Sequence, residues 1–450
     1  MKNSHKTNIR SWRWLASTGI KSTSDSIISP FLPLYGIELG ASSTQIGLLV
    51  SITSLLSILQ IAWARLADKI KNARIIAIVS NHISSLFNFL YAILRNLASF
   101  IVFRGFQSII SSASVPTTSV ILTERTPTKD WPYWNSLIQA FMVVGTLIGV
   151  LLGGILLSYF TGEMGYILLF VAAGFLSLIS SILFHLAVPK REKLVSRKRW
   201  HKIEEVSVSL DNILAIMKTD RNFIWLSLAN FIFVFGVNFS APFYIVFNIE
   251  DYSLSILQTA LLTSIGLVPQ IISSILSAKV IEKLRTKEVL IMGGLITSLF
   301  PIAFFIPFIT GATNNIYPIL ISMWIINGIA WGIINTSLST LTLDVIHPRR
   351  RTIQIAINNS LSAIALFLAP VLGGLVIQRS TIFYLVFLIS SIGRFVGSIL
   401  FIKVKEPVIG GTILRPISKI IITPIRVNIE KIVHTMSTIQ ERQRVRTNKK

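Results

Sequence analysis

The sequence predicts an all-α integral membrane protein with twelve transmembrane helices in two pseudo-symmetric six-helix bundles. Of the 450 residues, 52% are hydrophobic and only 14% are charged, whereas soluble proteins carry about 25% charged residues. Apolar runs long enough to cross a bilayer recur along the chain, and landmarks of the first half return in the second. The mean hydropathy of +0.68 excludes a soluble fold, because such a chain has too little polar surface for water.

Twelve apolar runs have the length that a transmembrane helix requires, since about 20 mostly apolar residues cross about 30 Å of hydrocarbon. The longest polar interruption divides these runs six and six. In order, the predicted spans are 13–36, 44–66, 74–95, 98–122, 134–159, 165–188, 222–248, 255–280, 287–310, 316–343, 352–378 and 380–403.

The polar segments predict the domain organisation. It consists of an N-terminal bundle (1–188), a cytoplasmic central loop (189–221), a C-terminal bundle (222–403) and a basic cytoplasmic tail (404–450). With the N-terminus inside, the outer loops hold only Arg95 and Arg379, and nearly all other basic residues lie on the inner side. This bias predicts a multi-pass plasma-membrane protein with both termini in the cytoplasm.

The tail favours the membrane surface as a partner. After Pro424 its apolar residues follow a helical stripe beside Arg426, Lys431 and Arg442, which is typical of a basic amphipathic helix on anionic headgroups. A disordered solubilising tail is the alternative. No motif points to nucleic acid, and we expect a monomer. The absence of cysteine excludes disulfides and thiolate metal sites, and we expect neither a metal nor a cofactor.

Four landmarks recur in chain order at a nearly constant offset, which indicates an internal repeat. The pairs are Leu32-Pro33-Leu34-Tyr35 with Ala241-Pro242-Phe243-Tyr244, Gln45 with Gln258, residues 64–69 with 278–283, and the small-residue pattern of 145–154 with that of 365–374. Six spans return the chain to the side where it began. The repeat is therefore parallel, with its axis along the membrane normal.

These landmarks resemble the major facilitator superfamily of secondary transporters over about residues 1–405. Residues 64–71, ARLADKIK, are similar to the family's G-x-L-a-D-[RK]-x-G-[RK] loop, and Arg104-x2-Gln107 to its R-x-x-Q-G pattern. Span five matches G-x3-G-P-x2-G-G except that Val150 replaces proline, which the family's antiporters favour. The resemblance implies two halves that rock about a midplane substrate site, with Arg104 linked to proton coupling.

Three charged residues within spans of the first half form a candidate proton-coupling site: Asp25, Lys21 and Arg104. An ionisable side chain at mid-membrane costs about 2.5 to 3.5 kcal/mol on insertion scales, so it is a candidate for function. Asp25 and Lys21 are one helical turn apart and share a face. Asp25 could carry a proton or bind a cationic group, with Lys21 or Arg104 as its counter-charge. The alternatives are a static ion pair and, for Arg104, a side chain that reaches the outer interface.

Candidate substrate contacts are Gln139, Asn238, Asn359 and Arg394. Amides donate and accept hydrogen bonds, which suits polar uncharged solutes, but they also join membrane helices. Arg394 lies deep in span twelve, where it could favour an anionic substrate or pair with serines and backbone carbonyls. Charged residues near the inner face predict ion-pair gates, with a solvated loop as the alternative: Asp68, Lys71, Arg74 and Glu124 in the first half, and Glu282, Arg285 and Asp344 in the second.

The function predicted is secondary active transport of a small organic solute by alternating access. A proton is the expected coupling ion, with sodium as the alternative. Asp25 and the many phenylalanines slightly favour efflux of hydrophobic compounds, whereas Val150 favours uptake of a sugar or metabolite. A transport-inactive receptor or scaffold on the same fold is a further alternative. The sequence contains no Walker A motif, which ATP-driven transport would require, and no D-x-x-D pair, which a lipid-modifying enzyme would require. We therefore do not expect the protein to be an enzyme.

Overall fold

The computed structural model describes residues 9–60, 62–63, 66, 73–114, 118, 131–188, 220–304, 316–346, 351–379 and 384–406. Every regular element in these ranges is helical. Most of the predicted central loop and nearly all of the predicted tail lie outside the described residues, so those two predictions stay untested.

In the first half, all six predicted spans coincide with helices. The elements are α1 (Ile9–Ile28), η1 (Ser29–Phe31), α2 (Leu32–Glu38), α3 (Ser43–Leu56), η2 (Ser57–Leu59), α5 (Ala73–Tyr91), α6 (Leu97–Ser111), α8 (Trp131–Tyr159) and α9 (Gly162–Ala187). Span one is broken between α1 and α2 because Pro30 and Pro33 cannot donate the backbone hydrogen bonds of a continuous helix.

The second half repeats this order. Its elements are α11 (Arg221–Ser240), α12 (Phe243–Glu250), α13 (Ile256–Lys283), α14 (Thr286–Ser298), α15 (Phe300–Ala303), α17 (Ile316–Val345), α18 (Arg351–Arg379), α19 (Leu385–Leu400) and η6 (Phe401–Lys403). Spans seven and nine are broken beside Pro242 and Pro301.

Among the described residues, eight helices are long and apolar enough to cross a membrane. They correspond to predicted spans five to twelve. The helices of spans two and four, Ser43–Leu59 and Leu97–Ser111, are apolar but shorter. Large apolar side chains such as Phe175, Ile275 and Ile392 are more than half exposed. Such an apolar surface is stable against the lipid of a bilayer, whereas proteins in water rarely expose it.

Small residues bring the helices of each half into close contact. Along α8, Gly145, Gly149 and Gly153 lie against α1, where an added Cβ would meet backbone oxygens of α1 at 2.2 to 2.7 Å. On the other side of α1, Ser17 and Ser180 of α9 exchange hydrogen bonds with each other's carbonyls at 2.9 and 2.8 Å. Close backbone packing of this kind is how membrane helices associate.

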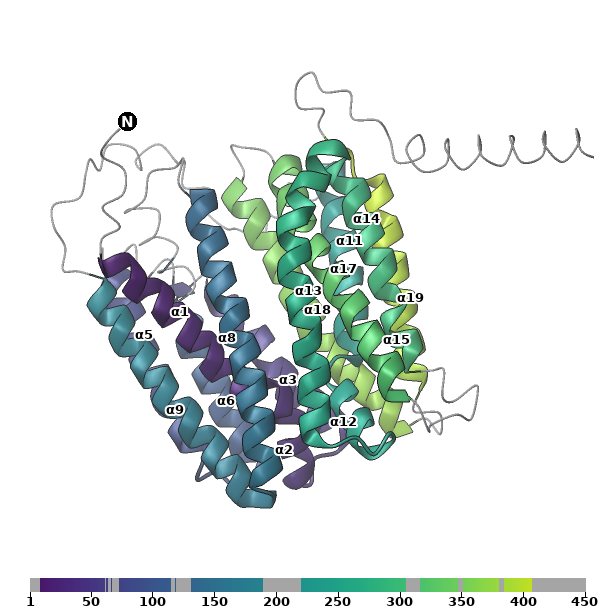
Figure 1. The fold of residues 1–450 in the computed structure, drawn as a ribbon. Helices are drawn as coiled ribbons and strands as arrows, with labels where there is room; N and C mark the ends of the chain where they lie inside the picture. Colours follow the sequence, from purple (N-terminus) through teal and green to yellow (C-terminus); the bar gives the residue numbers. More distant parts are fainter. Residues whose placement is uncertain are drawn as a thin grey trace, which may run out of the picture.

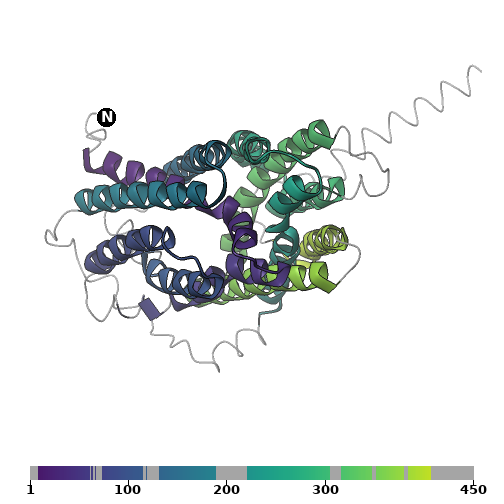
Figure 2. The same ribbon diagram turned by 90° about the horizontal axis from the view of Figure 1, so that it is seen from below.

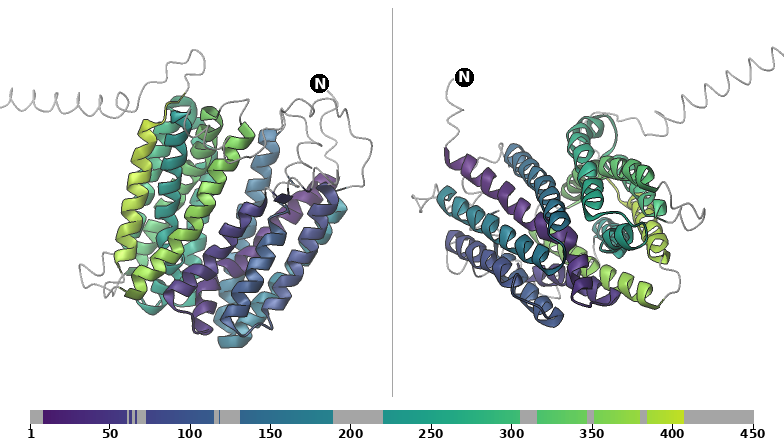
Figure 3. Two further views of the ribbon diagram at one scale, coloured as in Figure 1. Left: turned by 180° about the vertical axis from the view of Figure 1, so that it is seen from behind. Right: turned by 60° about the horizontal axis from the view of Figure 1, so that its bottom comes forward.

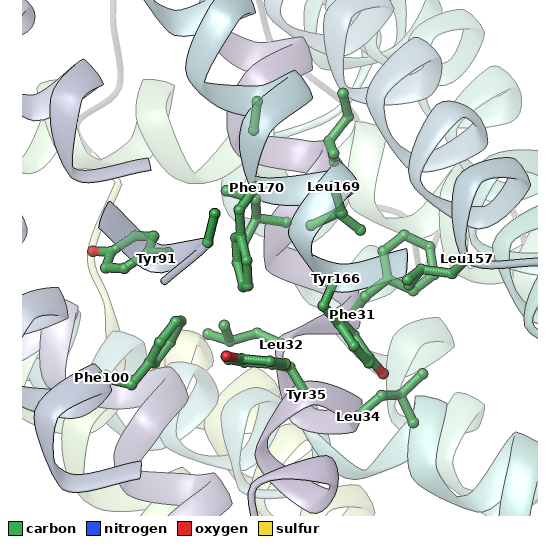
Figure 4. Packing of buried hydrophobic residues seen from close by; sticks show 14 of the residues in the cluster. Phe31, Leu32, Leu34, Tyr35, Tyr91, Phe100, Leu157, Tyr166, Leu169 and Phe170 are labelled. Atoms are coloured by element: carbon green, nitrogen blue, oxygen red, sulfur yellow. The ribbon is translucent and has the colours of Figure 1, made fainter. Parts of the chain in front are cut away.

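The repeat predicted from the sequence is confirmed in three dimensions. The helix α1 packs on α8 and α9, as α11 packs on α18 and α19. Tyr35 follows the break in span one and lies in an aromatic cluster with Phe100, Tyr166 and Phe170, shown in Figure 4. Its counterpart Tyr244 follows the break in span seven and lies among Phe300, Phe304 and Phe387.

The two halves meet at the end of the molecule that carries α2 and α12, and their ribbons diverge toward the opposite end (Figures 1 and 3). Seen from the α2 and α12 end, the two sets of helices lie side by side (Figure 2). Among the described residues, the most extensive packing between the halves is at two seams, that of α3 on α18 and that of α8 on α13, and α12 also packs on α2. At the first seam an added Cβ on Gly47 would lie 2.2 Å from the Pro370 carbonyl oxygen.

Candidate functional site

Asp25 lies on a face of α1 that its packing neighbours leave open. Its side chain is 57% exposed, although the adjacent Ser24 and Ser26 are buried. The Lys21 ammonium lies 2.5 Å from the Asp25 carboxylate. The i, i+4 pairing predicted from the sequence is therefore present, and the carboxylate keeps access to solvent or solute.

Arg104 extends from α6 toward this ion pair. Its charge interacts with Asp25 and with Tyr91 of α5, and its Nε–H is buried without a hydrogen-bond partner. Two cations, Lys21 and Arg104, thus face one carboxylate.

A polar network behind the ion pair joins α1, α5 and α6. Gln107, one turn after Arg104, donates to Asn88 at 2.9 Å and accepts from the Tyr91 hydroxyl at 2.5 Å. Asn88 in turn approaches the Ser24 hydroxyl at 3.5 Å. These partners were not among the predicted site residues, although the three-residue spacing of Arg104 and Gln107 places both on one helix face. The network fixes the helices that carry Asp25 and Arg104.

Arg394 is buried among groups of the second half, so its guanidinium is not exposed to an anionic substrate. It is 2% exposed and donates to Thr297, the Val237 carbonyl and the Tyr244 hydroxyl. All these groups belong to the second half. The structure favours the alternative in which Arg394 pairs with hydroxyls and backbone carbonyls.

The three predicted amides differ in how free they are to bind a solute. Gln139 on α8 and Asn359 on α18 are exposed and occupy equivalent places in the repeat. Asn238 is half-buried and donates to the Val234 carbonyl of its own helix at 2.8 Å. In the second half, α17 corresponds to α6 in the order of the spans and carries Trp324. The indole Nε1–H of Trp324 is buried without a hydrogen-bond partner. The hydropathy of this span does not single out Trp324 as a site residue.

Only some residues of the predicted gates belong to the described part of the structure. Asp68, Lys71 and Glu124 lie outside the described residues, and Glu282 lies in α13 with an undescribed side chain. Arg74 donates to the Val188 carbonyl at 2.8 Å. Arg285 precedes α14 as its N-cap, and Asp344 near the end of α17 interacts electrostatically with Glu406. In the described part of the chain, the ion pairs are Lys21 with Asp25 and Arg95 with Glu163.

The described residues contain no group of three or more His, Cys, Asp and Glu side chains that could hold a metal ion.

A family model of the Major Facilitator Superfamily matches the chain twice, over residues 15–250 and 226–428. The chain belongs to the major facilitator superfamily. The double match follows the two halves of the repeat, and the matched proteins are transporters rather than enzymes.

Curated relatives within the superfamily are distant. The multidrug resistance protein MdtG of Escherichia fergusonii is 27% identical over 193 residues, which are 42% of this chain and 46% of the relative. The chain thus spans about half the length of these multidrug-resistance relatives. An uncharacterised MFS-type transporter of Methanocaldococcus jannaschii is 23% identical over 77% of this chain and 87% of its own length.

Solved structures share the superfamily fold at low identity. A mutant of the nucleoside transporter NupG superposes with a TM-score of 0.71, at 14% identity, and covers 88% of this chain and 100% of its own. A bacterial homologue of the human lysosomal transporter Spinster, in an inward-facing and unoccupied conformation, gives a TM-score of 0.65 at 16% identity over 90% of this chain and 100% of its own. These likenesses show the fold alone.

Proposed function

We propose that this protein is a proton-coupled secondary transporter that moves a small, hydrophobic organic solute by alternating access, with efflux as the favoured direction. Asp25 carries this proposal. It is an acid within a predicted membrane span, its side chain is more than half exposed, and two cations compete for it. A group that is charged and accessible within a membrane protein is suited to carry a proton or a cationic solute.

The coupling step follows from the ion pair. Protonation of Asp25 neutralises the carboxylate, so Lys21 loses its 2.5 Å partner and becomes available for water or for another group. A cationic solute competes for the same carboxylate. Proton and solute then exclude each other, which is the requirement for antiport.

Alternating access is supported by where the halves meet. The backbone contacts at Gly47 and Gly374 close the end formed by α2 and α12. If both termini are cytoplasmic, as the basic residues predict, this is the outer end and the structure faces inward. We place the protein in the plasma membrane as a monomer. The multidrug-resistance relatives match 42% of this chain at 27% identity, and their names support efflux.

Uptake by symport is the second candidate, and Val150 favours it. The helix α8 runs without a break from Trp131 to Tyr159 with Val150 buried at the position where antiporters of the family favour proline. Two further possibilities are coupling to sodium instead of protons and a receptor that binds the solute without transporting it. The test below distinguishes both.

Proteoliposomes that contain the purified protein separate these functions. The probe is the lipophilic cation tetraphenylphosphonium, after binding has been checked by thermal shift. An antiporter accumulates the probe when the lumen is acidic, whereas a symporter does so when the outside is acidic. Binding of the probe without accumulation under either gradient indicates a receptor. Accumulation that follows a sodium gradient indicates that sodium, not the proton, is the coupling ion.

Asp25→Asn tests the carrier itself. We expect this variant to lose proton-driven accumulation by at least about tenfold, because an amide cannot release a proton at physiological pH. Asp25→Glu should retain it, and Glu163→Gln, which removes a more exposed acid from a peripheral ion pair, serves as the matched control. An unchanged pH dependence in Asp25→Asn would exclude Asp25 as the proton carrier.

A further inference from the structure

Arg394 is a buried cation that no carboxylate balances among the described residues. It lies about 14 Å along α19 from its first residue, Leu385, at 1.5 Å per residue, and it is 2% exposed. No described acidic side chain forms an ion pair with it. A charge inside a membrane protein is costly unless other groups compensate for it. The compensation here must come from dipoles.

The first dipole is the C-terminus of α14. Pro301 has no N–H, so the Thr297 carbonyl loses the donor that a continuous helix would supply four residues later. Arg394 replaces that donor: its Nη1 lies 3.0 Å from the Thr297 carbonyl oxygen and 3.2 Å from the Thr297 hydroxyl. Ser391, also on α19, donates to the adjacent Ser298 carbonyl at 2.6 Å.

The second dipole is the C-terminus of α11, which ends just before Pro242. The last carbonyls of a helix have no partner within the helix. Arg394 Nη2 donates to the Val237 carbonyl at 3.4 Å and to the Tyr244 hydroxyl at 3.0 Å, and Ser390 donates to the Gly236 carbonyl at 2.7 Å. Tyr244 lies beyond the break, in α12, so one guanidinium contacts both sides of it.

We propose that Arg394 is a positioning residue that ties the broken spans seven and nine to span twelve and thereby holds α12 where it closes the molecule. Each helix C-terminus carries about −0.5 elementary charge, so two of them together balance one guanidinium. The helix α12 packs on α2 of the other half. The contact from Arg394 to Tyr244 therefore links a buried charge to the end at which the halves meet.

In the described part of the first half, no buried arginine occupies the corresponding position. The aromatic clusters align Phe170 with Phe387, and the same register places Ser177 opposite Arg394. Tyr35, the counterpart of Tyr244, donates instead to the Leu94 carbonyl at 2.7 Å. The cation beside Tyr35 is Arg95, which is 44% exposed and pairs with Glu163, so the break of span one is held without a buried arginine. This role does not depend on the solute or on proton coupling.

Cross-linking across the closed end measures the effect. The Thr44 hydroxyl of α3 donates to the Gln378 side chain of α18 at 2.6 Å, and the chain has no cysteine. A Thr44→Cys, Gln378→Cys pair treated with a short bifunctional thiol reagent therefore reports how often this end is closed. Thermal unfolding is recorded for each variant in parallel.

We expect Arg394→Met to lower the cross-linked fraction at least about threefold, because the carbonyls of Thr297 and Val237 lose their donor and α12 loses its anchor. Arg394→Lys, which keeps the charge, should restore part of the cross-linking, and Arg95→Met is the control for loss of a peripheral arginine. Cross-linking at the parent level in a folded Arg394→Met variant, with or without a lower melting temperature, would overturn the proposal.

Two milder variants cover the case in which Arg394→Met does not fold. Tyr244→Phe removes only the hydroxyl beyond the break, and Ser390→Ala removes only a neighbouring donor. Both should lower cross-linking in the same direction by a smaller factor. If both fold and cross-link like the parent, the proposal is wrong. Because cross-linking needs neither a solute nor a gradient, failure here is distinct from failure of Asp25 as the proton carrier.

Discussion

Substitution of Gly47 by alanine provides a direct test of how tightly the two halves are joined. A Cβ at this position would lie 2.2 Å from the Pro370 carbonyl oxygen and 2.6 Å from its carbon. Both atoms belong to the backbone of α18, so no side chain can rotate away. The seam must open by about 1 Å, and overpacking of this kind costs about 1–3 kcal/mol.

This cost acts only on the arrangement in which the α2 and α12 end is closed. An energy of about 1–3 kcal/mol corresponds to a shift of about 5- to 150-fold in a conformational equilibrium. We therefore expect Gly47→Ala to move the population toward the form that is open at this end. Alanine also raises helix propensity by about 1 kcal/mol relative to glycine, but this gain is the same in both forms.

Pulsed EPR between spin labels on Glu38→Cys and Asp251→Cys would measure the shift, because these residues lie at the exposed C-terminal ends of α2 and α12. The control is Gly105→Ala, where an added Cβ would meet only a Leu56 methyl at 3.2 Å. An unchanged short-distance population in Gly47→Ala, with unchanged thermal stability, would refute the close-packed seam. Lower stability without a shift would show that no second arrangement is accessible.

Two further predictions concern the ends of the helices. The Glu406 carboxylate accepts the backbone N–H of Thr286 at 3.0 Å, at the start of α14, so Glu406→Gln should lower the free energy of unfolding by about 0.5–2 kcal/mol, measured by thermal or denaturant unfolding. Asp251 is exposed as a residue, but partial burial of its carboxyl raises the pKa of that group, which means that the folded state disfavours its charged form. Asp251→Asn should therefore raise the melting temperature at pH 7, and the gain should disappear as the pH falls below the usual Asp range, where both side chains are neutral; an equal gain at both pH values would contradict this account.

The candidate site combines two kinds of charge that serve different purposes. Asp25 is exposed and pairs with Lys21, which fits the proton carrier that we propose. Arg394 is buried and donates its hydrogen bonds to groups of the protein itself. Exposure therefore distinguishes the proposed proton carrier from the proposed positioning residue.

Much of the fold could be predicted from the sequence because its causes are local. Hydropathy determines which segments enter the membrane, and each of the twelve predicted spans coincides with a helix. Pro30, Pro33 and Pro242 stand at the breaks of spans one and seven, since proline removes a backbone donor, although Pro269 and Pro370 lie inside continuous helices. The pairing of Lys21 with Asp25 follows from helical spacing alone.

Only the tertiary structure decided what each charge contacts. Arg394 receives its partners from α11, α12 and α14, which lie about 90 to 170 residues away in the chain, and no local pattern predicts which helix ends converge on it. Gln107 and Trp324 likewise acquire their settings from neighbouring helices. Local sequence specifies helices and their breaks, whereas the burial of a charge depends on packing between distant segments.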